Sequence, residues 1–257
     1  KKKQSNESKL IYIPFIALAI VAVVFFALPS LHSSNGSTTS PTNPSTNQPF
    51  FQFAKVSNTN YAGNDTVQVY FISWYGCPFG ASDSWGLYIA LSKYGILNVT
   101  PNYSDFETIP ISQTNTIQGK VPGLIFNSFT PKSNVYFHPI YLLGRIFTSN
   151  STASLPNGTI ISYSGNSLVN LELNELQKEV PSWVYNLIYQ YQIQTPFEEG
   201  EGIAYLGNPP HIVSTIIITG PKGTWMIMGY DQQVNYGAPG LLAQYASASN
   251  YSPNVPE

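Results

Sequence analysis

The sequence has a single cysteine, Cys77, among 257 residues. A dithiol oxidoreductase needs an attacking thiolate and a second, resolving cysteine, so one cysteine excludes autonomous dithiol exchange. It also excludes a domain built on an internal disulfide framework, because such frameworks use even numbers of cysteines. The stability of any folded part must therefore come from its hydrophobic core.

Charged residues are scarce as well, at 9% of the chain, against about 25% in typical soluble domains. The chain has 11 Lys or Arg and 13 Asp or Glu, and four of the bases but only one of the acids precede Leu28. The remainder is thus net acidic, has no basic patch, and predicts no nucleic-acid partner. Uncharged polar side chains keep their hydration at any pH, which suits an acidic environment such as a thermoacidophile's surface.

Motifs for cofactors and metals are missing. The sequence has no Walker or dinucleotide-binding glycine motif and no nucleophile elbow, so it predicts no cofactor and gives no positive indication of an enzyme. His32, His138 and His211 are far apart in the chain, whereas a zinc site needs clustered ligands. We therefore predict no metal site.

An apolar run covers residues 10–28, 19 positions without a charge. A helix of that length spans about 28 Å, close to the hydrocarbon thickness of a bilayer. The alternative is a cleaved signal peptide, whose apolar region is typically about 7–15 residues long and ends at a small-residue site. The greater length and the Phe25-Phe26 pair near its end favour an uncleaved transmembrane helix.

Flanking charges orient this helix. Residues 1–9 contain four lysines and one acid, while no charged residue follows Leu28 until Lys55. The positive-inside rule then predicts a cytoplasmic tail at 1–9 and an extracellular location for everything after residue 28. The chain would be a single-pass cell-membrane protein with its C-terminal domain outside.

The first segment outside, residues 29–49, consists mainly of Ser, Thr, Asn and Pro without a charge. It cannot bury enough apolar surface to offset the entropy of ordering, and predicts an extended stalk. We expect a folded domain at 50–252 and a short tail at 253–257.

Sequons for N-linked glycosylation occur throughout the predicted outer part. In a chain rich in Asn, Ser and Thr some arise by chance, but their number and their turn-rich surroundings predict a glycosylated surface. The seven acceptors are Asn35, Asn64, Asn98, Asn102, Asn150, Asn157 and Asn250.

The start of the domain predicts a strand–helix–strand unit. Residues 50–56 and 66–75 are β-rich, and a helix follows with Pro78 at its first position and Gly95 as its stop. Residues 96–100 indicate the next strand, which would pair with 66–75 in parallel through a right-handed crossover.

The later elements are less regular. Residues 101–165 form a turn-rich insertion with strands at 121–129 and 135–143, followed by helical spacing over 167–193, where Pro181 separates two helices. Two β-rich runs, 211–219 and 224–230, surround a turn cluster and predict a hairpin. Residues 237–248 predict a final helix.

This order of elements, with Cys77-Pro78 at a helix start, resembles thioredoxin. The run Cys77-Pro78-Phe79, with Ser84-Trp85 and Ala90–Gly95 after it, is more closely similar to domain-of-unknown-function family 929 of archaea and actinobacteria. The resemblance covers about residues 66–100. It implies an α/β fold, a thioredoxin-like ectodomain with a large middle insertion.

The sequence departs from the family pattern at Gly80, where the second cysteine is expected. Cys77 would still lie at a helix N-terminus, whose N–H groups and dipole favour a thiolate. Two functions follow: a non-catalytic scaffold or accessory subunit that binds other surface or membrane proteins, or a monothiol exchange factor acting through Cys77. A buried sulfur would favour the scaffold.

The thioredoxin resemblance also implies a cis-proline before the C-terminal hairpin, opposite the cysteine. The candidates are Pro209 and Pro210, with Pro196 as a third. We prefer Pro210 because the β-rich run begins directly after it.

The topology predicts a definite result from protease treatment of intact cells. The domain after residue 28 should be digested while the lysine-rich tail survives, because only the domain is outside. Peptide mapping of the membrane fraction distinguishes the two ends. Survival of the domain with loss of the tail would reverse the orientation.

Overall fold

The computed structural model describes residues 48–105, 109–110, 116–117, 121–148, 151–197 and 200–230. These residues do not include the predicted tails, the membrane helix at 10–28, nearly all of the stalk or the final helix at 237–248. Within the described residues no helix has the length and apolar character needed to cross a membrane.

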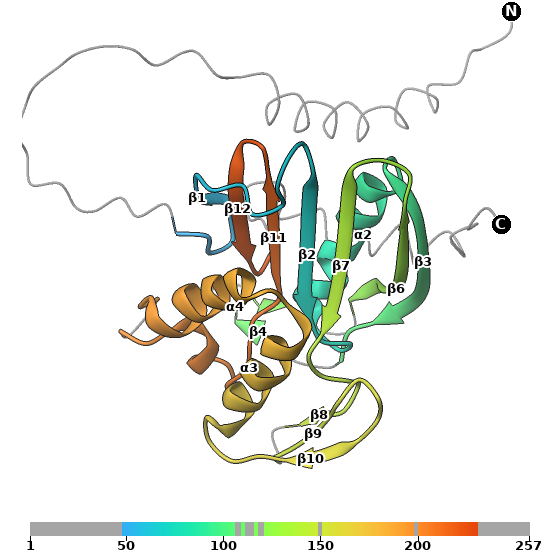
Figure 1. Cartoon of the computed structure of the whole chain (residues 1–257). Helices are drawn as coiled ribbons and strands as arrows, with labels where there is room; N and C mark the ends of the chain where they lie inside the picture. Colours follow the sequence, from blue (N-terminus) through green and yellow to red (C-terminus); the bar gives the residue numbers. More distant parts are fainter. Residues whose placement is uncertain are drawn as a thin grey trace, which may run out of the picture. The chain divides into compact units, whose positions relative to one another are not determined.

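A mixed five-stranded sheet lies at the centre of the fold, in the order β1-β12-β11-β2-β7 (Figure 1). The strands are β1 (Ala54–Ser57), β2 (Val67–Ser73), β7 (Val135–Tyr141), β11 (Thr215–Gly220) and β12 (Gly223–Met228). Strands β2 and β7 are parallel, and the other neighbours are antiparallel. The α/β class expected from the sequence is confirmed.

Strand β2 is buried on both faces of this sheet. Val69 and Phe71 pack into one hydrophobic cluster, whereas Tyr70 and Ile72 pack into the other. A strand covered on both sides needs apolar residues at successive positions, which explains its unbroken β-rich sequence.

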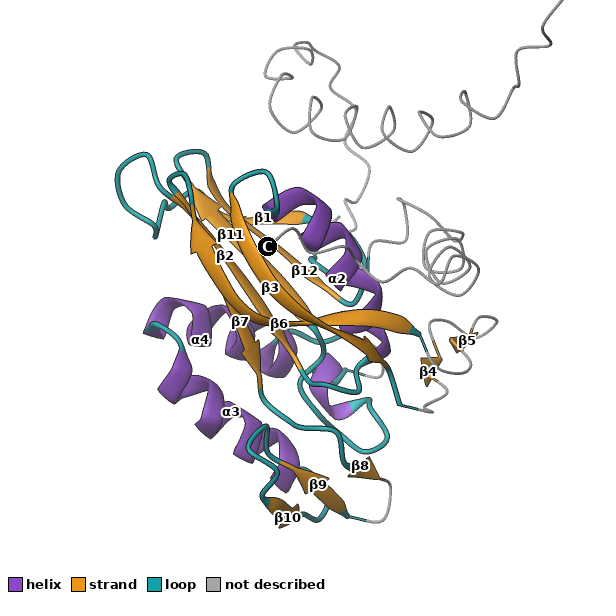
Figure 2. Ribbon diagram, turned by 90° about the vertical axis from the view of Figure 1, so that its right-hand side faces the viewer, coloured by secondary structure: helices purple, strands orange, loops and turns teal. Residues whose placement is uncertain are grey.

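One face of the sheet is covered by helix α2 (Pro78–Leu91) and a two-stranded ribbon (Figure 2). The ribbon pairs β3 (Gly95–Tyr103) with β6 (Pro122–Pro131) in antiparallel register. Helix α2 begins at Pro78 as predicted, but it ends at Leu91 with Ser92 as its C-cap, and Gly95 already belongs to β3.

The other face is covered by helices α3 (Ser167–Glu179) and α4 (Ser182–Ile188), and α4 continues as a π-helical segment, Tyr189–Gln194. Pro181 is the N-cap of α4, which confirms that it separates two helices. The short elements are β4 (Ile109–Pro110), β5 (Thr116–Ile117), β8 (Phe147–Thr148), β9 (Thr152–Ser154), β10 (Ile160–Ser162) and a 3-10 turn at Ile203–Tyr205.

The prediction that residues 96–100 pair with β2 in parallel is wrong. Strand β3 pairs with β6, and the parallel partner of β2 is β7. The burial of β3 largely alternates along its length, as expected for a strand with one covered face. The predicted strands at 121–129 and 135–143 are confirmed.

The close packing of α2 on β6 predicts a large effect of one methyl group. A Cβ on Gly123 would lie 2.5 Å from the Ala81 Cα and 2.7 Å from the Ala81 carbonyl oxygen. Gly123→Ala should therefore lower the free energy of unfolding by about 1–3 kcal/mol. Urea unfolding followed by circular dichroism measures this.

Gly86, exposed in the middle of α2, supplies the control, because a Cβ added there would meet no other atom within 4 Å. Gly86→Ala should stabilise the chain by about 0.5–1 kcal/mol through helix propensity. Equal effects at the two positions would contradict the packing of α2 against β6.

Candidate functional site around Cys77

The loop between β2 and α2, residues 74–77, is fixed by backbone contacts. The Tyr75 amide donates to the Leu143 carbonyl at 3.2 Å, and the Tyr75 carbonyl accepts from Asn102 Nδ2 at 2.6 Å. A Cβ on Gly76 would lie 2.2 Å from Cζ3 of the fully buried Trp74, so this approach favours glycine. These contacts therefore hold Cys77 in a defined position at the start of α2.

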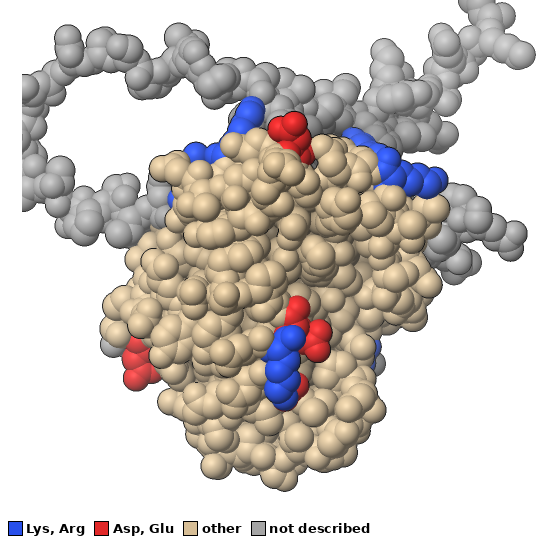
Figure 3. Space-filling view, in the orientation of Figure 1, with Lys and Arg blue, Asp and Glu red and all other residues tan. Residues whose placement is uncertain are grey.

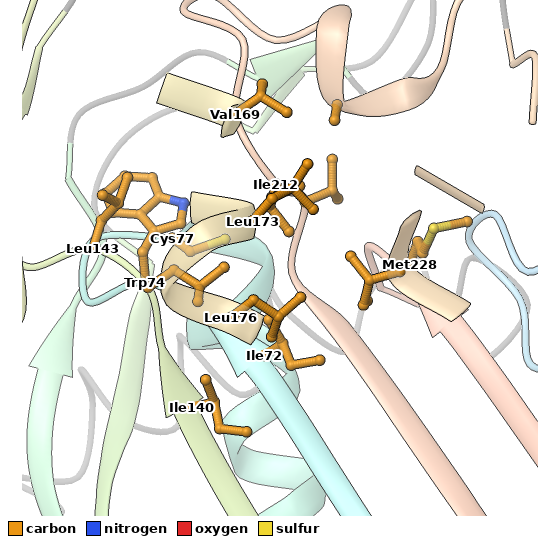
Figure 4. Packing of buried hydrophobic residues seen from close by; sticks show 14 of the residues in the cluster. Ile72, Trp74, Cys77, Ile140, Leu143, Val169, Leu173, Leu176, Ile212 and Met228 are labelled. Atoms are coloured by element: carbon orange, nitrogen blue, oxygen red, sulfur yellow. The ribbon is translucent and has the colours of Figure 1, made fainter. Parts of the chain in front are cut away.

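Cys77 is the N-cap of α2. Its backbone is extended, and its sulfur accepts a hydrogen bond from the Gly80 amide at 3.4 Å. Only 2% of the residue is exposed. Figure 4 shows the side chain among Trp74, Leu173 and Ile212, in the cluster between the sheet and α3. The sulfur is therefore a packed core atom with a capping role.

Burial raises the pKa of the Cys77 thiol to about 11, although hydrogen bonds from the Gly80 backbone and the Ser73 side chain act in the opposite direction. At neutral pH only about one thiol in ten thousand is then ionised. The sequence led us to expect that the helix start favours the thiolate. Burial has the larger effect, because removing the thiolate from water costs more free energy than its hydrogen bonds to N–H groups provide.

Gly80, where the resemblance implied a second cysteine, lies close to two serine hydroxyls. A Cβ on Gly80 would lie 2.1 Å from Ser73 Oγ and 3.2 Å from Ser214 Oγ. The hydroxyl of Ser73 thus lies where a residue-80 side chain would begin. No spacing in the sequence indicated these two serines, because they come from β2 and from the segment before β11.

Residues 211–214 replace the predicted start of the hairpin strand. They are buried but not paired as a strand, and β11 begins only at Thr215. The Ile212 amide donates to Glu172 Oε2 at 2.8 Å. The Val213 amide donates to Gln192 Oε1 at 2.7 Å, and Gln192 Nε2 donates to the Val213 carbonyl at 2.9 Å. We call these contacts the helix clamp.

Both clamp side chains are fully buried. Glu172 lies four residues after Leu168 and four before Leu176, on the apolar stripe of α3, so its spacing could have revealed it. Gln192 lies in the π-helical segment, which does not follow the residue spacing of an α-helix. No periodic pattern in the sequence therefore marks Gln192 as buried.

Burial raises the pKa of Glu172 well above its ordinary value, and the Ile212 amide only partly opposes this. The other oxygen, Oε1, is buried without a hydrogen-bond partner among the described residues. Nearby, burial lowers the pKa of His211, whose Nδ1 lies 2.8 Å from the Pro209 carbonyl. Burial therefore disfavours the charged form of both groups, Glu172 beside the segment and His211 within it.

One cis peptide bond occurs in the described part of the chain, between Asn208 and Pro209. The preference for Pro210 is therefore wrong, and the other candidate of that pair is the cis-proline. The preference assumed that the strand starts at His211, but β11 starts four residues later.

The described sequons fall into two groups. Asn64, Asn98 and Asn157 are exposed. Asn102 is buried, with Nδ2 bound to Tyr75 and Oδ1 accepting from Arg145, so the folded domain withholds this acceptor amide. Asn35, Asn150 and Asn250, like His32, lie outside the described residues.

Residues 48–230, as far as the structure describes them, contain no cluster of three or more His, Cys, Asp or Glu that could hold a metal ion. His138 is half-buried and stacks on Tyr70 with ring centroids 4.5 Å apart, while His211 lies in the cluster near Cys77. The two histidines therefore have separate structural surroundings.

Comparison with known proteins places the sequence in a family. The family model described as "Domain of unknown function (DUF929)" matches residues 52–255. The chain belongs to this family. The match extends far beyond the residues around Cys77 that carried the resemblance and covers the whole described sheet. No curated protein and no solved structure matches the chain.

The buried carboxyl predicts a pH dependence of stability. The folded pKa of Glu172 is raised, so its contribution is fully present below about pH 4.3, the ordinary pKa of an unfolded glutamate, and is lost as the pH rises toward the folded pKa. Glu172→Gln should therefore become progressively more stable than the wild type as the pH rises. Denaturant midpoints between pH 3 and 8 measure the difference.

His211 acts in the opposite direction, since its lowered pKa costs stability as the pH falls below about 6.5, but it is common to both proteins and cancels. Glu179→Gln, at an exposed acid of the same helix, is the control and should show no such trend. A constant difference between Glu172→Gln and the wild type would contradict a raised pKa of the buried carboxyl.

Proposed function

We propose that the chain is a membrane-anchored, glycosylated cell-surface protein whose thioredoxin-like domain has lost its redox chemistry. The domain serves as a non-catalytic scaffold or accessory subunit that binds other surface or membrane proteins. The observation that carries this proposal is the burial of the Cys77 sulfur in the core.

The arrangement of the sheet supports a thioredoxin-like fold. Helix α2 with Cys77 at its start connects β2 to the parallel strand β7, α3 and α4 follow, and the β11–β12 hairpin closes the other side of β2. It differs from the order on which the resemblance to thioredoxin rested in one respect, because the strand parallel to β2 is β7 and not residues 96–100. The insertion consists of the β3–β6 ribbon before β7 and the β8–β10 strands after it.

Three features of the structure disfavour thiol exchange at Cys77. A monothiol exchange factor needs a thiolate that a partner's disulfide can reach. Here the sulfur is 2% exposed, its pKa is raised to about 11, and the neighbouring segment 211–214 is held by the helix clamp. These features favour the scaffold over the monothiol function.

The surface is suited to protein binding rather than to charged ligands. Figure 3 shows a face on which Lys, Arg, Asp and Glu are confined to a few isolated groups. Tyrosine offers apolar area with a polar tip and few rotatable bonds, which makes it an efficient contact residue. Within the part of the chain that the structure describes, the exposed tyrosines are Tyr61, Tyr94, Tyr103, Tyr136 and Tyr189.

A detergent pull-down of the full chain from native membranes tests the proposal, with Cys77→Ser as the comparison. Serine keeps an oxygen that can cap α2, so the variant isolates the thiol chemistry. We expect the same partners with both proteins and no partner that a reductant releases. A partner lost in Cys77→Ser and released by reductant from the wild type would establish the monothiol function instead.

A further inference from the structure

Strand β3 presents an unpaired edge. It pairs with β6 along one side over its whole length, Gly95–Tyr103, and its other side makes no backbone ladder with any described residue. Figure 1 shows β3 at the margin of the ribbon, with β6 between it and β7. Unpaired N–H and C=O groups along such an edge are a template for pairing with a second chain.

The usual protection of an edge strand is incomplete here. No Lys, Arg, Asp or Glu occurs between residues 95 and 103, and Ile96 and Tyr103 are 50% and 53% exposed. Pro101 removes one donor, but residues 95–100 contain no proline, so those of their backbone N–H groups that point away from β6 remain able to pair. A long, uncharged, partly apolar edge is an association hazard.

A sequon lies in the middle of this edge strand. Asn98 and Thr100 are both exposed, and residues two apart in a strand point to the same face. Asn127, from β6, donates to Asn98 Oδ1 at 3.3 Å and to Thr100 Oγ1 at 2.9 Å. The contact engages the amide oxygen of this exposed residue and not Nδ2, the atom that receives a glycan.

Asn127 reaches both groups because the ladder is irregular at this point. Asn98 is paired with Ser128 and Val99 with Phe126, so Asn127 is the extra residue of a β-bulge. Bulges redirect a side chain at a chosen position. Among the described sequons, Asn98 is thus the exposed one on the β3 edge, since Asn102 is buried and Asn64 and Asn157 lie in turns.

We propose that Asn98 carries an N-linked glycan that covers the edge of β3 and prevents its pairing with another chain. This inference rests on the proposed extracellular location. In the transfer, Nδ2 bonds to the anomeric carbon of a lipid-phosphate-linked oligosaccharide and loses a proton, while the bond from that carbon to the phosphate oxygen breaks and the lipid phosphate leaves. The glycan takes the place of the edge charges that the strand lacks.

The test uses the full chain purified in detergent from its native host, with glycopeptide mass spectrometry and analytical ultracentrifugation over a range of concentrations. The wild type and Thr100→Ser, which keeps the sequon, should carry glycan on Asn98 and show a concentration-independent sedimentation coefficient. Asn98→Gln should lose the glycan and shift to larger species as its concentration rises.

Two further variants test whether the position of the glycan matters and whether a charge can replace it. Asn157→Gln removes an acceptor in the β9–β10 turn and should leave the sedimentation coefficient unchanged with concentration. Asn98→Lys lacks the glycan but places a positive charge on the edge strand, and should also remain monodisperse.

Each outcome decides a definite point. An unmodified Asn98 beside glycan at another sequon, an Asn98→Gln protein that stays monodisperse, or an Asn98→Lys protein that associates like Asn98→Gln would overturn the edge inference alone. A chain with no glycan at any sequon would overturn the proposed glycosylated surface as well.

Discussion

The fold around Cys77 depends on the helix clamp, in which Glu172 and Gln192 bind the backbone of residues 212–213. These backbone groups are buried and lie outside the sheet ladder, and a buried polar group without a partner costs about 1–3 kcal/mol. These groups therefore have partners only when α3 and the π-helical segment are docked beside them. The clamp joins the layer of α3 and α4 to the hairpin that completes the sheet.

The same constraint determines the chemistry of the site. Because residues 211–214 are held against α3, Ile212 lies in one cluster with Cys77 and Trp74, and the sulfur has no route to solvent through this side. The Ser73 hydroxyl lies 2.1 Å from where a Cβ on Gly80 would be. Residues 77 and 80 are thus both part of a packed interior.

Local features were predictable from the sequence, and long-range ones were not. Pro78 at the helix start and Pro181 between two helices act on neighbouring residues, so their effects follow directly from the local sequence. The parallel partner of β2 is separated from it by an inserted ribbon, which no local pattern reveals. The spacing of Glu172 on an apolar stripe could have revealed it, whereas the contacts of Gln192 and Ser73 depend on residues distant in the chain.

The rate at which Cys77 reacts with a small alkylating reagent tests the closed site most directly. In the folded full chain at pH 8 the reaction should be at least about 100-fold slower than in urea, because the sulfur is buried and its pKa is about 11. Gln192→Ala, which opens the helix clamp, should increase the rate in the folded state. Alkylation of the folded wild type as fast as that of the unfolded chain would contradict the account.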